Sequence, residues 1–309
     1  MSLLIRRSNL MVPVTDVDAA GSAWRHNADA VTLDLEDGFT EARKAVARER
    51  IREAIAPAAR GAAEVFVRVN KAYLQADLEA SVWPGLCGVM LPRIESAAEV
   101  LEAAEMVSAL ERQRGIAVGS LSFILLLESA RAVWDIRTII TASPRITQVG
   151  LDERDLAEDL GIESLPEHDP FDYARGRVVV EAIAAKVDPI GMAYPLSAKP
   201  REAAAAEIHA TATKAKNLGM KGVICPYAGW VAPVNSAFTP TPERVAWNKR
   251  VREAFAAGVA AGTAAVPLEG RMIDVPVDEW AIVVLAMADA CAARDAEKQS
   301  ALARSQAGA

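Results

Sequence analysis

Short runs of β-branched and leucine residues alternate along the chain with longer stretches rich in Ala, Glu and Arg. In the longer stretches, such as Glu41–Ala56 and Ser96–Arg112, apolar residues recur every three or four positions, which predicts amphipathic helices. The short runs predict eight strands: Leu4–Pro13, Ala30–Leu35, Val65–Asn70, Gly88–Leu91, Leu121–Leu127, Thr147–Leu151, Pro189–Ala193 and Gly222–Cys225.

This alternation predicts an α/β protein whose parallel strands are joined by helical crossovers. Eight such repeats are the number that closes a (β/α)8 TIM barrel. A doubly wound open sheet is the alternative, but its Gly-x-Gly-x-x-Gly fingerprint is missing after the first strand, which ends Val12-Pro13-Val14. We therefore predict a (β/α)8 barrel.

The pattern changes after Pro240. It predicts a helix over Pro242–Ala261, then a connector rich in Gly, Ala and Pro, a short segment, and a long helix from Val277. These elements are extra to eight strand–helix units. We expect residues 1–240 to form the barrel and residues 241–309 to form a C-terminal helical extension.

Composition limits the classes of partner. The chain has 309 residues, 52% of them hydrophobic, and 34 Lys and Arg against 41 Asp and Glu give a net charge of −7. The absence of a basic cluster argues against nucleic-acid binding. The longest apolar run, Ala281–Ala288, is far shorter than the roughly 20 residues of a membrane span, and no signal peptide precedes the first strand, so we expect a cytoplasmic protein.

The cysteines do not indicate a disulfide, a metal site or a nucleophile. Cys87, Cys225 and Cys291 are odd in number and far apart, which excludes a disulfide framework and a Cys-x-x-Cys metal site. Cys225 ends a predicted strand and could be a nucleophile, but no His lies near it in sequence. We interpret it as a packed thiol.

Polar residues at strand ends are the candidate site residues, because active sites of such barrels lie at the carboxyl ends of the strands. Glu128 follows the fifth strand and Asp155 lies just beyond the sixth. Two carboxylates on adjacent strand ends would suit Mg²⁺ or Mn²⁺ and leave positions for water and substrate oxygens. Arg68, at the end of the third strand, could bind a substrate carboxylate with both arms of its guanidinium.

Structural interpretations compete with these roles. Asp155 could equally be the N-cap of the helix that follows it. Arg68 could pair with Asp34 or Glu36 at the end of the second strand. The acids from Asp34 to Asp37 could form a solvated turn, although their mutual repulsion calls for a cation or arginines nearby.

These residues lie in motifs that resemble the citrate lyase β-subunit (CitE-like) family of the HpcH/HpaI aldolase superfamily. Each motif is short, but their order is specific and spans nearly the whole chain. They are Arg7-Ser8-x-Leu10-x-Val12-Pro13, Leu33-Asp34-Leu35-Glu36-Asp37-Gly38, Val67-Arg68-Val69-Asn70, Leu91-Pro92-Arg93-Ile94-Glu95-Ser96, Leu127-Glu128-Ser129-Ala130, Asp155-Leu156-x-x-Asp159-Leu160-Gly161, Tyr173-Ala174-Arg175-Gly176-Arg177, Pro233-Val234-Asn235 and Met272-Ile273-Asp274-x-Pro276.

The resemblance implies a Mg²⁺-dependent carbon–carbon lyase on a (β/α)8 barrel. Its substrate would be a 3-hydroxyacyl thioester such as citryl-, malyl- or citramalyl-CoA, cleaved to or formed from a keto acid and an acyl thioester. The thioester could instead be carried on an acyl-carrier protein. The resemblance also implies a homotrimer or hexamer.

The resemblance assigns roles residue by residue. Glu128 and Asp155 would hold the metal, and Arg68 would bind the carboxylate of the keto acid. Asp274 would act as acid or base from the C-terminal arm of a neighbouring subunit. Two further sets are implied: Glu36 and Asp37 hold waters bound to the metal, and Arg7, Lys44 and Arg48 meet the CoA phosphates.

The chain departs from the family pattern at three strand ends. Cys225 stands where family members commonly carry a His in a Gly-Lys-x-x-Ile-His-Pro run. Leu151-Asp152-Glu153-Arg154 replaces a loop of small residues, and Ala193-Tyr194-Pro195-Leu196 lacks a common Asp. These changes leave the substrate open. They also leave an alternative function, a catalytically silent barrel that binds an acidic metabolite or serves as an assembly subunit.

Overall fold

The computed structural model of the chain describes residues 4–36, 40–162, 169–191 and 203–307. One sheet has eight parallel strands in the order β7-β6-β5-β4-β3-β2-β1-β8. The strands are β1 (Ser8–Pro13), β2 (Ala30–Asp34), β3 (Glu64–Arg68), β4 (Gly88–Leu91), β5 (Ser122–Leu127), β6 (Ile146–Leu151), β7 (Asp188–Ile190) and β8 (Val223–Cys225). A parallel bridge between Ile190 and Gly222 joins the two end strands and closes the barrel. The predicted barrel is confirmed.

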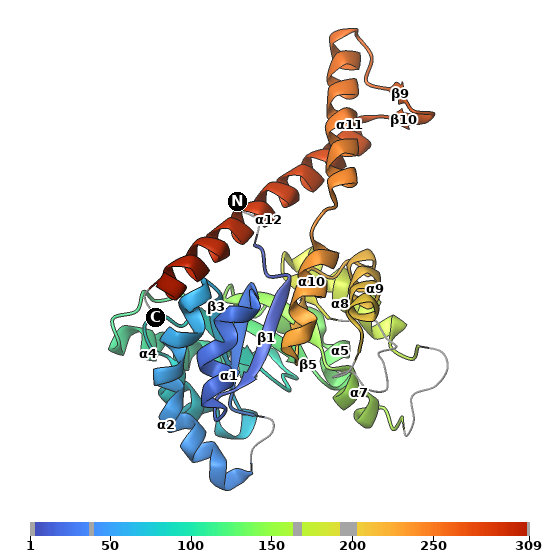
Figure 1. Cartoon of the computed structure of the whole chain (residues 1–309). Coiled ribbons are helices and arrows are strands. Elements are labelled where there is room, and N and C mark those ends of the chain that lie inside the picture. Colours follow the sequence, from blue (N-terminus) through green and yellow to red (C-terminus); the bar gives the residue numbers. More distant parts are fainter. Residues whose placement is uncertain (1–3, 37–39, 163–168, 192–202, 308–309) are drawn as a thin grey trace.

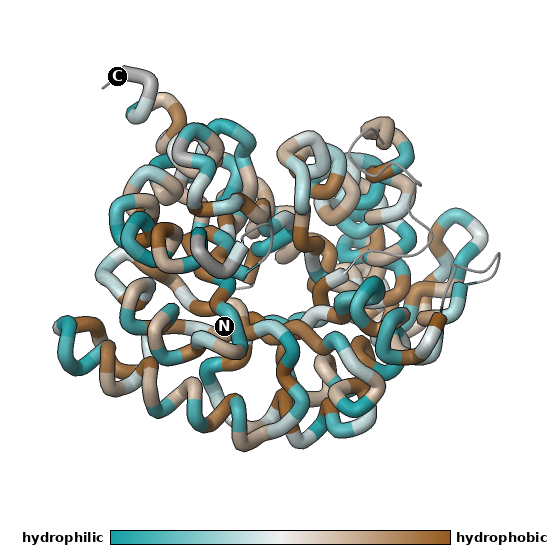
Figure 2. Tube along the Cα trace, turned by 90° about the horizontal axis from the view of Figure 1, so that it is seen from below, coloured by the Kyte–Doolittle hydropathy of each residue, from teal (hydrophilic) through white to brown (hydrophobic). Residues whose placement is uncertain are grey.

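Helices surround the strands (Figure 2). They are α1 (Val17–Ser22), α2 (Glu41–Ala58), α3 (Leu74–Ser81), α4 (Ala97–Gln113), α5 (Ala130–Trp134), α6 (Ile136–Ile140), α7 (Glu153–Asp159), α8 (Asp172–Ala185), α9 (Ala205–Leu218) and α10 (Val231–Phe238), with short 3₁₀ turns between some of them. The predicted helices Glu41–Ala56 and Ser96–Arg112 correspond to α2 and α4 within two residues. None of the helices in the described ranges is long and apolar enough to span a membrane.

Two hydrophobic layers hold the barrel together. A large outer layer lies between the strands and the helices, and a smaller inner layer fills the barrel with Ala30, Phe66, Met90, Ile124, Leu126 and Ile190. This division follows from the alternation of side chains along each strand, which sends successive residues to opposite faces. The identity of the inner residues therefore fixes which residues further along each strand also face inward.

Closure of the barrel depends on a glycine. A Cβ atom at Gly222 would lie 2.1 Å from the carbonyl oxygen of Arg6, at the junction between β8 and the chain that leads into β1. Any larger residue would push these strands apart. Below the inner layer, Arg6 pairs with Glu64 and donates a hydrogen bond to Thr147, so polar groups fill the amino end of the barrel.

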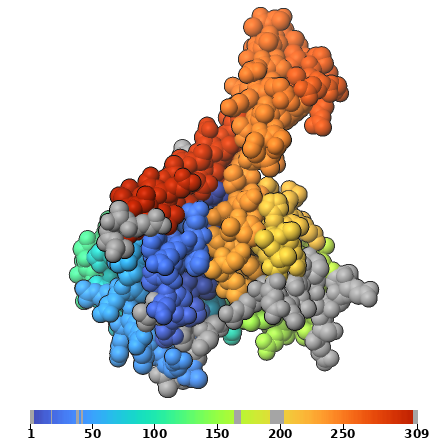
Figure 3. Space-filling view, in the orientation of Figure 1, coloured from blue at the N-terminus to red at the C-terminus, as the bar shows by residue number. Residues whose placement is uncertain are grey.

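Residues beyond the barrel form an arm. The arm consists of α11 (Pro242–Ala260), a hairpin of β9 (Val266–Leu268) and β10 (Arg271–Ile273), and the long helix α12 (Val275–Ala307). Figure 1 and Figure 3 show α11 and the hairpin projecting away from the barrel, whereas α12 returns across it. The hairpin was not predicted, although its two-residue turn, Glu269-Gly270, has positive φ at both positions, as a type I′ turn requires.

The second half of α12 is anchored to the amino end of the barrel. Lys298 donates a hydrogen bond of 2.6 Å to Asp29, and Asp295 pairs with Arg7 at 2.6 Å. Asp29 and Arg7 directly precede β2 and β1. Helix α12 therefore covers the end of the barrel opposite to the carboxyl ends of the strands.

Candidate active site

Strand alternation sends three polar side chains inward at the carboxyl rim. On β3, Phe66 belongs to the inner layer, so Arg68 two residues later also faces inward. The same step leads from Leu126 on β5 to Glu128, and on β2 two such steps lead from Ala30 to Asp34. All three residues are buried. The barrel thus places an arginine and two acids around one opening.

Asp155 joins this group from the next strand–helix junction. It lies in the first turn of α7, which follows β6, the neighbour of β5 in the sheet. The N-cap of α7 is Asp152, whose carboxylate accepts hydrogen bonds from the backbone N–H groups of Arg154 and Asp155. The capping interpretation of Asp155 is therefore wrong, and its side chain is available to the site.

The contacts of Arg93 show that Glu128 and Asp155, the two candidate metal ligands, lie close together. Arg93, which follows β4, has Nη2 at 2.8 Å from Oδ2 of Asp155 and Nε at 3.3 Å from Oε2 of Glu128. Glu128 and Asp155 therefore share one side of the opening. This is the arrangement that the sequence predicted for the two acids.

The electrostatics of the acids call for a positive partner. Burial, a hydrogen-bonding contact with Asp155 and the negative charges of Glu36 and Asp152 raise the pKa of Glu128 to about 8. A carboxylate with such a pKa holds a proton near neutral pH unless a cation offsets the charge. The pair is thus suited to a cation.

The donor set fits Mg²⁺ or Mn²⁺. Both side chains offer hard oxygen ligands, and the Arg93 guanidinium already stands between them as a cation. In the described ranges, no group of three or more Asp, Glu, His or Cys side chains is placed to hold a metal. Two protein ligands would leave positions for water and substrate oxygens.

Arg68 is held by two acids. Its Nε and Nη2 atoms each donate a hydrogen bond of 2.7 Å to Asp34, and Nη1 lies 3.1 Å from Oε2 of Glu36. Arg68 therefore pairs with both Asp34 and Glu36, as its structural interpretation predicted. This pairing also fixes the guanidinium at the rim. Asp37 lies outside the described residues.

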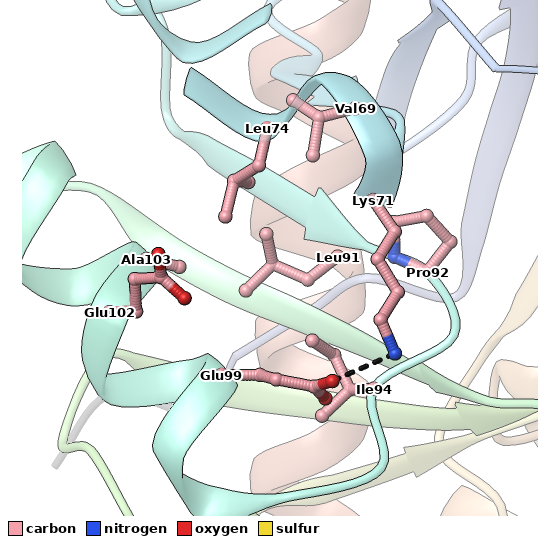
Figure 4. Close-up of a pocket in the computed structure, with 9 residues that line it drawn as sticks. All are labelled: Val69, Lys71, Leu74, Leu91, Pro92, Ile94, Glu99, Glu102 and Ala103. Atoms are coloured by element: carbon pink, nitrogen blue, oxygen red, sulfur yellow. Dashed lines mark ion pairs between the residues drawn. The ribbon is translucent and has the colours of Figure 1, made fainter.

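A polar cavity of about 370 Å³ opens beside these groups. Its wall includes Lys71, Arg93, Glu95, Glu128 and Asp155. A second, mostly apolar cavity of about 170 Å³ lies next to it, between β3, β4 and the helices outside them (Figure 4). Lys71 contributes to both cavities, and its ion pair with Glu99, at 2.8 Å, borders the apolar one.

Lys44 and Arg48 lie together on α2, beside Tyr73. Their cationic groups lie 5.5 and 5.0 Å from the ring centre of Tyr73, and Arg48 also pairs with Asp77 at 2.6 Å. Asp77 in turn accepts hydrogen bonds from Asn70, the residue that ends the predicted third strand. The two cations are thus positioned on one helix face next to β3.

Arg7 lies elsewhere. It is buried at the amino end of β1, where it makes hydrogen bonds to Asp29, Asp295 and Thr239. The structure therefore separates it from Lys44 and Arg48 by the length of the barrel. This position does not support the expected contact with CoA phosphates. The predicted strand Leu4–Pro13 already included Arg7 in its amino-terminal half, and the contact with CoA phosphates was implied by the resemblance alone.

Asp274 is also remote from the rim of its own barrel. It lies between β10 and α12, where its carboxylate accepts a hydrogen bond from the N–H group of Val277. Around it, the arm exposes large apolar side chains: Met272, Val275, Trp280, Ile282 and Val283. The segment between β10 and α12 that contains Asp274 lies on the arm that projects away from the barrel (Figure 1).

Cys225 faces the outer layer, where it packs among the residues beneath the helices. Burial raises the pKa of its thiol. The interpretation as a packed thiol is confirmed. The segment with Tyr194 lies outside the described residues.

Sequence reasoning assigned no role to two arginines that shape the site. One is Arg93, and the other is Arg175, which is buried and pairs with Glu153 and Asp169. Glu153 is the first residue of α7, so Arg175 holds the helix that carries Asp155. Both arginines lie in motifs that resemble the family, and Arg93 directly follows the Leu91-Pro92 strand end.

Comparison with known proteins identifies the family. The model of the family described as HpcH/HpaI aldolase/citrate lyase matches residues 7–226. The chain belongs to this family. The match covers the barrel from the start of β1 to the end of β8.

Relatives resemble the chain over most of its length. A citrate lyase subunit beta-like protein of Deinococcus radiodurans is 31% identical over 280 residues, covering 88% of this chain and 93% of the relative. An L-malyl-CoA/beta-methylmalyl-CoA lyase of Cereibacter sphaeroides is 28% identical over 285 residues, covering 85% and 88%. The crystal structure of CitE from Mycobacterium tuberculosis with magnesium, acetoacetate and coenzyme A superimposes with a TM-score of 0.72 at 25% identity, covering 92% of this chain and 98% of that one.

Proposed function

We propose that this protein is a Mg²⁺-dependent carbon–carbon lyase. Its substrate is a 3-hydroxyacyl thioester such as citryl-, malyl- or citramalyl-CoA, which is cleaved to a keto acid and an acyl thioester or formed from them. The observation that carries this proposal is the convergence of Glu128, Asp155 and Arg68 at the carboxyl rim of a family barrel. Relatives named citrate lyase subunit beta and malyl-CoA lyase support the reaction class.

Glu128 and Asp155 would hold the metal, which when bound supplies a Lewis acid for the hydroxyl or ketone oxygen of the substrate. Mn²⁺ would be accepted by the same ligands. Glu36, next to Arg68 and 3.7 Å from Nε of Arg93, lies where it can hold waters around the ion, and we assign the same role to Asp37. The CitE structure from Mycobacterium tuberculosis, a complex with magnesium and acetoacetate, supports both the ion and the keto acid.

Arg68 would bind the carboxylate of the keto acid. Asp34 holds its guanidinium at two nitrogen atoms, which keeps the planar group in one orientation before substrate arrives. A preoriented guanidinium loses little side-chain entropy when it binds an anion. The substrate carboxylate would thus set the position of the neighbouring carbon that takes part in bond cleavage.

Asp274 would move the proton at the carbon next to the thioester. When the carbon–carbon bond breaks, the 3-hydroxyl loses its proton and becomes the ketone of the keto acid. The electron pair of the broken bond remains on the carbon next to the thioester, which gains a proton, and the reverse reaction removes that proton again. We propose that Asp274 comes from a neighbouring copy in a homotrimer or hexamer. The remote position of Asp274 and the apolar side chains exposed around it support this assembly.

Lys44 and Arg48 would meet the phosphates of the thioester carrier. Both cations lie on α2, and Arg48 is linked through Asp77 to Asn70, which lies two residues after Arg68. The coenzyme A in the relative's structure favours CoA as the carrier. An acyl-carrier protein presents a similar phosphopantetheine arm, so these two cations suit it as well. We infer that the reaction takes place in the cytoplasm, where CoA esters are available.

Calorimetric titration of Mg²⁺ into the wild type and into Glu128→Ala tests the proposal. We expect heat of binding in the wild type and a loss of that heat in the variant, because a single remaining carboxylate binds Mg²⁺ poorly. Circular dichroism of both proteins provides the control for folding. Equal heats in the two proteins would contradict the metal site and favour a silent barrel.

A further inference from the structure

Arg93 reaches into the carboxylate group from the end of β4. Its guanidinium lies 2.8 Å from Asp155, 3.3 Å from Glu128 and 3.7 Å from Glu36, measured between the nearest nitrogen and oxygen atoms. These acids come from three different strand–helix junctions. One cation therefore contacts all three of these acids around the expected position of the metal.

The backbone of Arg93 is fixed, whereas its side chain is not enclosed. Its N–H group donates a hydrogen bond of 3.1 Å to Oε1 of Glu128, and its carbonyl oxygen accepts one of 2.8 Å from Nζ of Lys71. Lys71 is held in turn by Glu99 (Figure 4). With φ of 54°, Arg93 has a left-handed conformation that a non-glycine residue rarely adopts unless its surroundings impose it.

The side chain of Arg93 is 59% exposed, although the acids it contacts are mostly buried. The long arginine side chain can therefore turn outward while the clamped backbone stays in place. Its other neighbours at the rim of the polar cavity include Lys71 and Glu95. No packed core has to open for the guanidinium to leave the acids.

The guanidinium of Arg93 and a divalent ion compete for the same carboxylates, because both are positively charged. Three largely buried carboxylates this close repel one another unless a cation offsets their charge. Arg93 supplies one positive charge and contacts Oε2 of Glu128 and Oδ2 of Asp155, the two carboxylates assigned to the metal. A divalent ion held by Glu128 and Asp155 would repel the guanidinium and replace it as their partner.

We propose that Arg93 is an internal counter-cation that holds Glu128, Asp155 and Glu36 together without metal and is displaced when a divalent ion binds. This inference rests on the metal site of the proposed function and adds a residue that sets its affinity. Because metal must first replace the guanidinium, Arg93 lowers the affinity of the site. The same exchange moves a positive group to the cavity rim whenever the ion is bound.

Mg²⁺ titration of Arg93→Gln, followed by calorimetry, tests the exchange. Without a competing guanidinium, the variant should bind Mg²⁺ about fivefold more tightly than the wild type or better, the equivalent of one surface ion pair. Arg137→Gln is the matched control, since Arg137 is also exposed and also pairs with a carboxylate, that of Glu181, but on the outer helices. Its Mg²⁺ affinity should equal that of the wild type.

Thermal unfolding gives a second readout. Arg93→Gln should lower the melting temperature in EDTA, where the acids lose their counter-cation, and should leave it unchanged at saturating Mg²⁺. Arg93→Lys keeps a charge and should lie between the two proteins in both measurements. Equal or weaker Mg²⁺ binding by Arg93→Gln would overturn the exchange alone, whereas a wild type that binds no Mg²⁺ would overturn the proposed metal site as well.

Discussion

At the residue scale, the site depends on arginines whose position is set by acids. Asp34 holds Arg68 at two atoms, and Glu153 with Asp169 holds Arg175 beneath α7. Such pairs orient a guanidinium before any ligand arrives. The function proposed for Arg68 therefore depends on the planar shape of its side chain as well as on its charge.

Replacement of Arg68 by Lys should weaken binding of the keto acid. A point charge cannot reproduce two parallel hydrogen bonds, so KM for the keto acid in the condensation direction should rise about tenfold or more. Arg145→Lys is the matched control, because Arg145 is a buried arginine held by Glu111 at two atoms but lies at the amino end of β6. It should reduce stability without raising KM. An unaltered KM in Arg68→Lys would count against the assigned contact.

Much of the site could be predicted from the sequence because strand ends can be located there. Once β5 and β3 are known, alternation places Glu128 and Arg68 on the inner face. The role of Arg93 could not be predicted in this way, since its contacts depend on a left-handed backbone that no local pattern indicates. The expected role of Arg7 came from the resemblance alone, whereas its position in the amino-terminal half of the predicted strand Leu4–Pro13 already pointed to the amino end of the barrel.

At the element scale, α12 joins the arm to the barrel through buried charges. Lys298 and Asp29 are both fully buried, and Asp29 also pairs with Arg7 at 2.8 Å. Burial alone would raise the pKa of Asp29, but its hydrogen bonds and charge interactions with Arg7 and Lys298 outweigh burial and lower the pKa. The anchor of α12 is therefore strongest while Asp29 is ionised.

This anchor predicts a pH dependence of stability. Since the pKa of Asp29 is lower in the folded protein than in the unfolded chain, its contribution is fully present above about pH 4 and is lost as the pH falls through the folded pKa. Asp29→Asn should reduce the free energy of unfolding by about 3 kcal/mol at pH 7, because it removes the buried counter-charge that Arg7 and Lys298 share. The difference from the wild type should shrink towards pH 2.

Urea unfolding from pH 2 to 7 measures this difference. Glu181→Gln provides the control, since Glu181 pairs with Arg137 on the surface and should contribute little. A difference between Asp29→Asn and the wild type that stays constant with pH would contradict the assignment.

The elements themselves were predictable where a hydrophobic run is bounded by polar residues. Strand β4 has the predicted limits, Gly88–Leu91, and α11 differs from its predicted helix by one residue. The hairpin of the arm was missed because β9 and β10 have three residues each and are largely exposed, so they lack a buried alternating pattern. Helix α12 also starts two residues before its predicted position, with Pro276 in the first turn, where proline is tolerated.

At the scale of the whole molecule, α11 and the hairpin of the arm project away from the barrel of their own chain (Figure 1). Arg294 donates a hydrogen bond to the backbone carbonyl of Asp29 at the amino end of the barrel. Asp274 lies 20 residues before Arg294. Most of that length is helix, which spans about 30 Å. The site of one chain is thus completed, in the proposed assembly, by head-to-tail contacts that close into a ring.

Mixed oligomers test this assembly. Asp274→Ala and Arg68→Ala should each be inactive alone, because each lacks one part of every site. Mixing the two should restore part of the activity, since some sites then combine an intact barrel with an intact arm. Mass spectrometry of the mixed oligomers is the control for exchange. Verified mixed oligomers without activity would contradict a shared site.

The most direct measurement of the central claim is thioester cleavage with and without metal. Purified wild type and Asp155→Ala are incubated with citryl-, malyl- and citramalyl-CoA in Mg²⁺ or in EDTA, and release of the keto acid is followed. We predict release by the wild type in Mg²⁺ from at least one thioester, and none in EDTA or by the variant. Cleavage that persists in EDTA or in Asp155→Ala, or no cleavage of any of the three thioesters, would contradict the account.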